Sequence, residues 1–168
     1  MTKQEYMDMY DVVGAAMEVY NTLGRGMAEP IYQEALAVEM DKRGMKAERE
    51  KELRLRYKDV LLEKTYYADF YYKGIIIELK SVEEIVSDHR AQLFNYMRIT
   101  KHHRGILFNF GEIGLHSERY LYLPEPDDFI LLNQDNYKSY IEKKLFIFVD
   151  KIIHIIHIRF LNKYGILI

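Results

Sequence analysis

The sequence predicts an α/β fold, with helices packed on a mixed (α+β) sheet. Three observations support this prediction. Two segments with helical spacing of apolar residues come first, three strand-like runs joined by short turns follow, and another helical segment separates the third run from a fourth. A helix between two strands is typical of a crossover connection, which joins strands that run parallel to each other.

The two N-terminal helices are predicted from apolar periodicity and from the residues at their ends. Residues 4–23 place apolar side chains at every third or fourth position, and Gly24 ends this segment. Pro30 suits the first turn of a second helix, because its missing N–H has no partner there. We expect the second helix to end near Gly44.

A three-stranded meander is expected after these helices. Residues 53–57 alternate apolar and basic side chains, and residues 60–72 and 75–77 are rich in aromatic and β-branched side chains. The dipeptides Lys58-Asp59 and Lys73-Gly74 are predicted to form the two turns that separate these runs.

The crossover helix and the further strands complete the predicted fold. Ser87 is expected to cap a helix that runs from residue 88 to about residue 100. Residues 106–108 form a short apolar run between glycines, and residues 119–123 are predicted to add one more strand.

Composition limits the class of protein. A chain of 168 residues suits one domain, and 49% hydrophobic with 30% charged residues excludes a wholly disordered chain. The 24 Lys and Arg residues against 26 Asp and Glu residues exclude a histone-like binder but not a local basic surface. The absence of Cys excludes disulfides, thiolate zinc sites and cysteine nucleophiles.

Neither a secretory signal nor a membrane span is predicted. Residues 1–11 lack an apolar stretch after a basic start. Charged and polar residues interrupt the most apolar stretch, residues 145–168, which argues against a span. His154 and His157 within it are interpreted as packing or surface residues. We therefore expect a cytoplasmic protein with no membrane partner.

The sharpest local prediction concerns two carboxylates on the second hairpin. If Lys73-Gly74 forms a two-residue turn, Asp69 falls directly opposite Glu78, and Lys80 shares the face of Glu78. Opposed carboxylates repel each other. A divalent cation would offset this repulsion, and so would a salt bridge with Lys80. The opposite face of the hairpin is apolar and is predicted to enter the core: Ala68, Phe70, Tyr72, Ile75, Ile77 and Leu79.

Four short patterns occur in order along the chain. They are GxxExxY at residues 26–32, Asp69 followed by Glu78-Leu79-Lys80, QxxxY at residues 92–96, and Asn109-Phe110-Gly111. Together they resemble the GxxExxY proteins, a branch of the PD-(D/E)XK nuclease superfamily, over residues 8–123. The resemblance implies a restriction-endonuclease-like core with a site for Mg²⁺ or Mn²⁺.

The resemblance also implies a role for each residue of this site. Asp69, Glu78 and the backbone carbonyl of Leu79 would bind the metal, and Lys80 would orient or help to deprotonate the attacking water.

Residues of two helices would complete the site. Glu29 would add a carboxylate to the metal shell, and Glu34 is its rival for this role. Gln92 and Tyr96 lie at i and i+4 of one helix and would position the metal site or a phosphate.

The implied activity is metal-dependent hydrolysis of phosphodiester bonds in nucleic acid, with DNA favoured over RNA. The alternative is a catalytically silent nuclease-like fold that binds nucleic acid or protein. Basic residues along 54–58 and within 90–104 are candidates for contact with a phosphate backbone, and a solvated surface is the alternative for each. We expect the nuclease-like domain at residues 1–126 and a C-terminal extension of unknown role at 127–168, where a homo-oligomer or a protein partner would attach.

Overall fold

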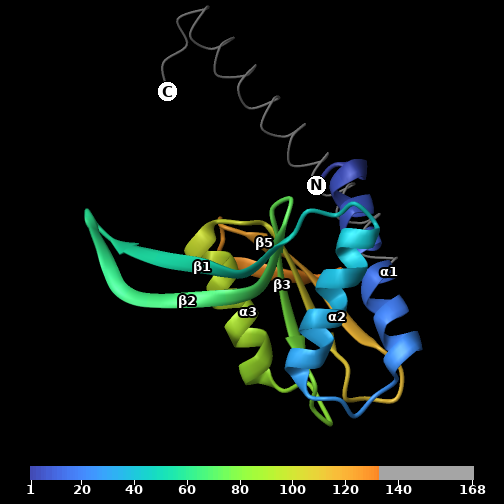
Figure 1. The fold of residues 1–168 in the computed structure, drawn as a ribbon. Coiled ribbons are helices and arrows are strands. Elements are labelled where there is room, and N and C mark those ends of the chain that lie inside the picture. Colours follow the sequence, from blue (N-terminus) through green and yellow to red (C-terminus); the bar gives the residue numbers. More distant parts are fainter. Residues whose placement is uncertain (133–168) are drawn as a thin grey trace, which may run out of the picture. The chain divides into compact units, whose positions relative to one another are not determined.

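Six strands form one mixed sheet in the order β1-β2-β3-β4-β5-β6 (Figure 1). The computed structural model describes residues 1–132, so His154, His157 and most of the expected C-terminal extension at 127–168 lie outside the described residues. The strands are β1 (Glu48–Tyr57), β2 (Val60–Tyr72), β3 (Ile75–Lys80), β4 (Arg104–Asn109), β5 (His116–Leu123) and β6 (Asp128–Leu131). The helices are α1 (Lys3–Leu23), α2 (Glu29–Lys42) and α3 (Ser87–Thr100).

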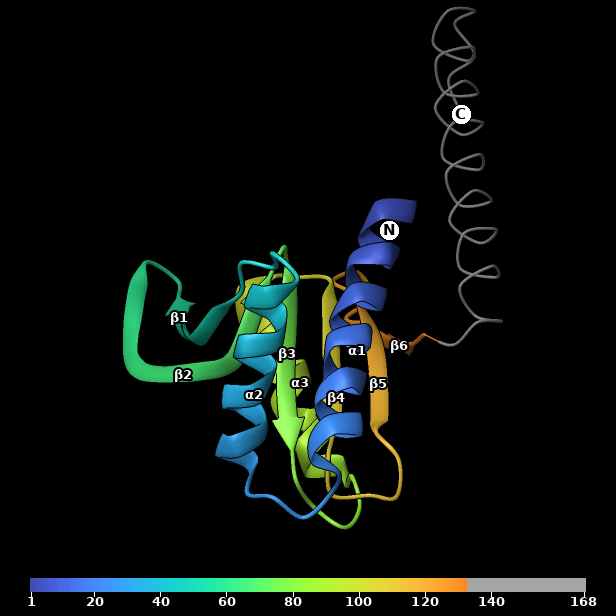
Figure 2. The same ribbon diagram turned by 45° about the vertical axis from the view of Figure 1, so that its right-hand side comes forward.

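The topology confirms the predicted mixed α/β fold. Strands β3 and β4 pair in parallel, and the other neighbouring strands pair antiparallel. The connection between β3 and β4 contains α3, as expected for a crossover. Helices α1 and α2 cover one face of the sheet and α3 covers the other (Figure 2). Strand β3 is buried between these layers up to Leu79, so Lys80 is its first half-buried residue.

The register of the second hairpin is also confirmed. Tyr72 pairs with Ile75, and two further pairs follow up to Phe70 and Ile77. The turn residue Lys73 has φ 45° and Gly74 has φ 81°, which are the positive values that a type I′ turn requires. The ladder between β2 and β3 stops just before the two acids.

The apolar residues predicted to enter the core from this hairpin are all buried. One of them lies on a different face than expected. Ala68 packs with Ile76 and Leu93 on the α3 side, whereas strand alternation from Phe70 predicts the side of α1 and α2. The reason is that β2 leaves β3 after Phe70, so the alternation of the paired segment does not extend to Ala68.

Beyond the sheet, β1 and β2 continue as a two-stranded arm (Figure 1). The arm comprises residues 54–66, which are exposed except for two half-buried positions. Tyr57 pairs with Val60 at its tip, which confirms the expected turn at Lys58-Asp59. A register shift between Arg54 and Arg56 interrupts the pairing within the arm.

Two local features differ from expectation. Helix α3 begins at Ser87, and Val86 rather than Ser87 occupies the N-cap, where its N–H donates to His89 Nδ1. Strand β6 was not expected and lies past residue 126 in the same compact unit, Met1–Leu132. Its Phe129 ring stacks on Phe94 of α3, with centroids 4.0 Å apart, which fixes β6 against the sheet. In the part of the chain that the structure describes, no helix is long and apolar enough to cross a membrane.

Candidate active site

Asp69 and Glu78 lie where β2 parts from β3, and their carboxylates take the place of ladder hydrogen bonds. The Leu79 N–H donates to Asp69 Oδ2 over 2.7 Å, and the Asp69 N–H donates to Glu78 Oε1 over 3.4 Å. Each acid is therefore bound to the backbone of the opposite strand. This reciprocal bonding holds the two carboxylates side by side at the edge of the paired segment.

The two acids share a poorly solvated environment. Glu78 is 1% exposed, and burial followed by repulsion from Asp69 raises the pKa of its carboxyl well above the ordinary value. Burial raises the pKa of Asp69 to about 6, although the Leu79 N–H and the Lys80 ammonium oppose the shift. Lys80 Nζ lies 3.7 Å from Glu78 Oε2. One ammonium thus faces two carboxylates, which leaves excess negative charge in the site.

Helix α3 holds Oε2 of Glu78, the carboxylate oxygen that does not accept from the Asp69 N–H. Gln92 Nε2 donates to Glu78 Oε2 over 2.9 Å and to the Tyr96 hydroxyl over 3.1 Å. Tyr96 is buried, and this burial raises the pKa of its hydroxyl, so the group stays protonated at neutral pH. The i, i+4 spacing predicted from the sequence therefore places both side chains beside Glu78.

Helix α2 supplies a third acid and a residue that the sequence analysis missed. Gln33 Nε2 donates to Asp69 Oδ1 over 2.9 Å and lies 3.5 Å from Glu29 Oε1. The Glu29 carboxylate also raises the pKa of both Asp69 and Glu78, which shows that its charge acts on the pair. Glu34 is exposed. The position of Gln33 four residues after Glu29 was the available indication of a shared helix face.

The tyrosine of the GxxExxY pattern positions the loop before α2. Tyr32 is fully buried, and its hydroxyl donates to the Gly24 carbonyl over 2.7 Å and accepts from the Met27 N–H over 3.1 Å. Ser81, directly after β3, donates to the Met27 carbonyl over 2.8 Å. These bonds tie the start of α2 to the end of β3, so Glu29 is held near the acids.

The Asn109-Phe110-Gly111 pattern closes the carboxyl end of the parallel strands. Asn109 Nδ2 donates to the Val82 carbonyl over 2.9 Å, and Asn109 Oδ1 accepts from the Val82 N–H over 3.0 Å. A Cβ at Gly111 would lie 2.2 Å from the Val82 oxygen, so only glycine fits. The Phe110 ring stacks on Tyr32, with centroids 4.4 Å apart. The pattern is therefore structural and supports the connection that follows Lys80.

A hollow of about 310 Å³ opens beside Asp69. It is lined by Gln33, Glu50, Tyr67, Ala68 and Asp69. Its walls come from α2, β1 and β2, and Tyr67 belongs to the strand that continues into the arm. A ligand in this hollow would reach the Asp69 carboxylate from solvent.

The donor atoms suit a hard divalent cation in kind, because carboxylate and carbonyl oxygens are the ligands that Mg²⁺ prefers. Asp69 and Glu78 supply the carboxylates, and the Leu79 carbonyl belongs to the same strand end. Within residues 1–132, no three acidic or histidine side chains are grouped closely enough to hold a metal. The paired acids therefore form a partial ligand set, with Glu29 linked to it through Gln33.

The basic residues near α3 are largely occupied. Arg90 forms two hydrogen bonds with Glu118, of 2.8 and 2.6 Å, and Arg98 Nε lies 3.0 Å from Asp127 Oδ1. Arg104 is buried and donates to the Glu5 carbonyl over 3.0 Å. These contacts favour the structural interpretation of this group over contact with a phosphate backbone.

Comparison with known proteins shows the superfamily of the chain. A family model described as the PD-(D/E)XK nuclease superfamily matches residues 7–120, and the chain belongs to this superfamily. No curated protein matches the chain. Among solved structures, the chain is similar to "Crystal structure of SSO0001", with 17% identity and a TM-score of 0.41. That match covers 70% of this chain and 57% of that one, so the chain spans little more than half of its length.

Proposed function

We propose that this protein is a metal-dependent nuclease of the GxxExxY branch that hydrolyses phosphodiester bonds in DNA rather than RNA. The observation that carries the proposal is the pairing of Asp69 with buried Glu78 beside Lys80, in a chain that belongs to a nuclease superfamily. Burying two carboxylates beside one ammonium raises the pKa of each acid. A dication would offset that excess negative charge.

Asp69, Glu78 and the Leu79 carbonyl would hold Mg²⁺ or Mn²⁺. Glu29 would add a carboxylate to the metal shell, and Gln33, which contacts both Glu29 and Asp69, would hold it beside the pair. A bound dication supplies polarisation of the phosphoryl oxygen and a lowered pKa for bound water. The reciprocal bonds between acids and backbone keep the carboxylates from turning into solvent. The site is thereby preorganised before substrate arrives.

The other residues have supporting roles in this proposal. The side chain of Lys80 is 13% exposed, so its ammonium faces the site with little competing water and would orient the attacking water molecule. Gln92 holds Oε2 of Glu78 and is itself held by Tyr96. We propose that both are positioning residues.

The alternative function is a catalytically silent nuclease-like fold that binds nucleic acid or protein. One observation favours it: in the described part of the chain, no three metal-ligating side chains stand together. Calorimetry with Mn²⁺ separates the two functions, because the enzyme requires metal binding that Asp69→Ala removes.

The direct test incubates the protein with mixed single- and double-stranded DNA and RNA in Mg²⁺, Mn²⁺ or chelator. We expect cleavage with metal only, and its loss in Asp69→Ala and in Lys80→Ala. Glu34→Ala is the matched control, because this exposed acid on α2 has no part in the proposed site. Circular dichroism checks that each variant folds. Cleavage at the wild-type rate in both site variants would remove these residues from the mechanism.

A further inference from the structure

Beyond its base, where the Tyr66 ring lies 5.8 Å from the Tyr96 ring of α3, the β1–β2 arm extends from the sheet without a helix to cover it (Figure 1). Its tip carries large exposed side chains: Tyr57 and Val60 are each 63% exposed. Leu55 and Leu61 are exposed nearby. A strand pair that is exposed along its length needs a reason, because uncovered strands with apolar side chains are an association hazard.

One face of the arm leads to the hollow beside Asp69. Tyr67 lines the hollow and pairs with Glu52 of β1, and the next pair on the same face is Arg54 with Thr65. Arg56 lies two residues beyond Arg54, past the register shift, and is exposed on the arm. The arm therefore extends the surface on which the proposed scissile phosphate would rest.

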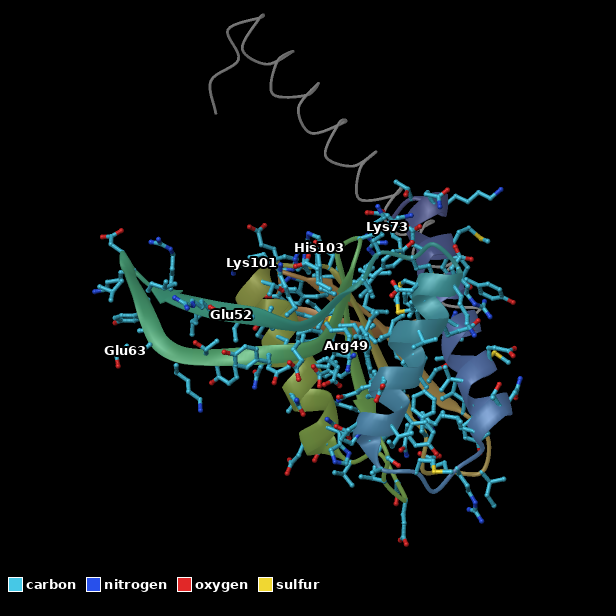
Figure 3. All side chains as sticks on the ribbon, in the orientation of Figure 1. Arg49, Glu52, Glu63, Lys73, Lys101 and His103 are labelled. Carbon is cyan, nitrogen blue, oxygen red and sulfur yellow. The ribbon has the colours of Figure 1, made fainter. Side chains whose placement is uncertain are left out.

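The arm is basic in a chain whose net charge is −2. Its four basic residues outnumber its two acidic ones: Arg54, Arg56, Lys58 and Lys64 against Asp59 and Glu63. Figure 3 shows Glu63 on the arm and Glu52 near its base. Arg56 contacts the Asp59 carbonyl over 3.5 Å and is bonded to no carboxylate among residues 1–132. Its charge is thus available to an anionic partner.

The dimensions of the arm match a DNA duplex. Val60 at the tip lies nine residues from Asp69 along β2, which corresponds to roughly 30 Å at the rise of a strand. At the spacing of phosphates along DNA, this reach covers about nine base pairs. The major groove of B-form DNA admits a two-stranded β-ribbon, whereas the deep and narrow major groove of A-form RNA does not.

We propose that the arm is a duplex-binding element that lies along the major groove of DNA beside the scissile phosphate, with Arg56 and Lys58 on backbone phosphates. This inference rests on the proposed nuclease function and adds to it a preference for double-stranded DNA. Tyr57 and Val60 contact base edges or sugars near the tip, where they are shielded from water.

A second copy of the chain is the rival occupant, because β1 is an edge strand with exposed apolar side chains. Charge argues against it. Pairing of the two copies along the arm segment of β1 would bring Arg56 and Lys58 of one copy near those of the other, and like charges on adjacent strands destabilise a sheet. Charged edge residues are also the usual protection against such pairing.

The test measures affinity in chelator, so that binding is separated from cleavage. The full chain is titrated into a fluorescent duplex of about 20 base pairs and into one strand of it. We expect tighter binding to the duplex. In the Arg56→Ala/Lys58→Ala variant, duplex affinity should fall about tenfold, and the slope of log affinity against log salt should decrease by about two.

The matched control is Lys42→Ala/Lys46→Ala, which removes the same charge from exposed positions outside the arm. Its effect should be less than about twofold. Unchanged duplex affinity and salt slope in the arm variant would overturn the proposal. Sedimentation measures the oligomeric state. The proposal would also be overturned if the wild-type protein were a dimer and Tyr57→Ser/Val60→Ser made it a monomer without changing its affinity for DNA.

Failure of the arm proposal is distinct from failure of the nuclease proposal. Asp69→Ala should abolish cleavage and keep duplex affinity. If the wild-type protein cleaves DNA and the arm variant binds the duplex with unchanged affinity, the arm proposal alone is rejected. Duplex binding that needs the arm, without cleavage in any metal, would reject the nuclease function alone.

Discussion

Gln33 of α2 donates to Asp69 of β2 over 2.9 Å, so a neutral amide holds one oxygen of a proposed metal ligand. Glu29 lies on the other side of the same amide, at 3.5 Å. The amide thereby spaces two carboxylates that would otherwise repel each other directly. Helix α2 controls the orientation of Asp69 as well as the charge around it.

Replacing Gln33 with alanine should weaken Mn²⁺ binding about fivefold, because the freed Asp69 carboxylate loses one hydrogen bond worth about 1 kcal/mol. Titration calorimetry measures the affinity. Gln33→Glu provides the contrast: an added carboxylate should strengthen cation binding while lowering stability without metal. Equal Mn²⁺ affinity in all three proteins would contradict a role for this contact.

The unusual pKa of Asp69 should appear in the pH dependence of stability. Its value is about 6 in the fold and 3.8 ordinarily, so the folded protein binds the extra proton between these values. Stability contributed by the protonated carboxyl is therefore lost as pH rises from about 4 to about 6. The free energy of unfolding of Asp69→Asn should not show this decrease, which is worth at most about 3 kcal/mol in the wild-type protein.

Urea denaturation of both proteins in chelator, at several pH values across this window, measures the difference. Glu78 also has a raised pKa, and repulsion from Asp69 contributes to it, so the difference between the two proteins reports the titration of the coupled pair. Parallel stability curves would show that Asp69 titrates normally.

The Arg90–Glu118 pair should be a stabilising contact with its own acid dependence. Burial opposes ionisation of Glu118, but hydrogen bonds from Arg90, Tyr120 and His116 outweigh it and lower the pKa to about 2. This stability is present above about pH 4.5 and is lost as pH falls toward 2. Arg90→Ala should cost about 2 kcal/mol at neutral pH, measured by urea denaturation.

Arg98→Ala is the control for that measurement. Its pair with Asp127 is exposed to solvent, so the substitution should lower stability less than Arg90→Ala does. A similar loss in both variants would mean that the Arg90 pair has no special contribution.

Gly111→Ala should destabilise the protein by about 2 kcal/mol or more, because the new methyl group would collide with the Val82 backbone. The proposed nuclease activity should fall with it, since the displaced connection follows Lys80. Gly14→Ala is the matched control: its Cβ meets only the Arg43 side chain, at 3.3 Å, and helix propensity should favour alanine. Thermal melting compares the two, and equal melting temperatures would contradict the steric argument.

Local rules were sufficient to predict the hairpin register, because a two-residue turn at Lys73-Gly74 leaves one alignment of β2 and β3. The contact between Gln33 and Asp69 was not predictable in this way. It depends on how α2 packs beside a strand 36 positions away, which no local pattern specifies. Strand β6 was not predicted for a related reason, because the stacking of Phe129 on aromatic rings of α3 and β5 holds it in place.

The position of Ala68 shows where alternation stops being a guide. Alternation holds from Tyr72 to Phe70 while β2 is paired with β3, and fails once the strand turns outward. The same departure frees the backbone N–H groups that the two acids bind. The feature that made the face of Ala68 unpredictable is thus the feature that builds the candidate site.

Because the arm leaves the sheet past the last β2–β3 pair, its length is independent of the geometry around the acids. One more residue on each strand would move the tip by about 3.3 Å, close to the rise of one base pair. In the proposed duplex-binding role, the footprint would therefore grow or shrink in single-nucleotide steps while the geometry around the acids stays fixed.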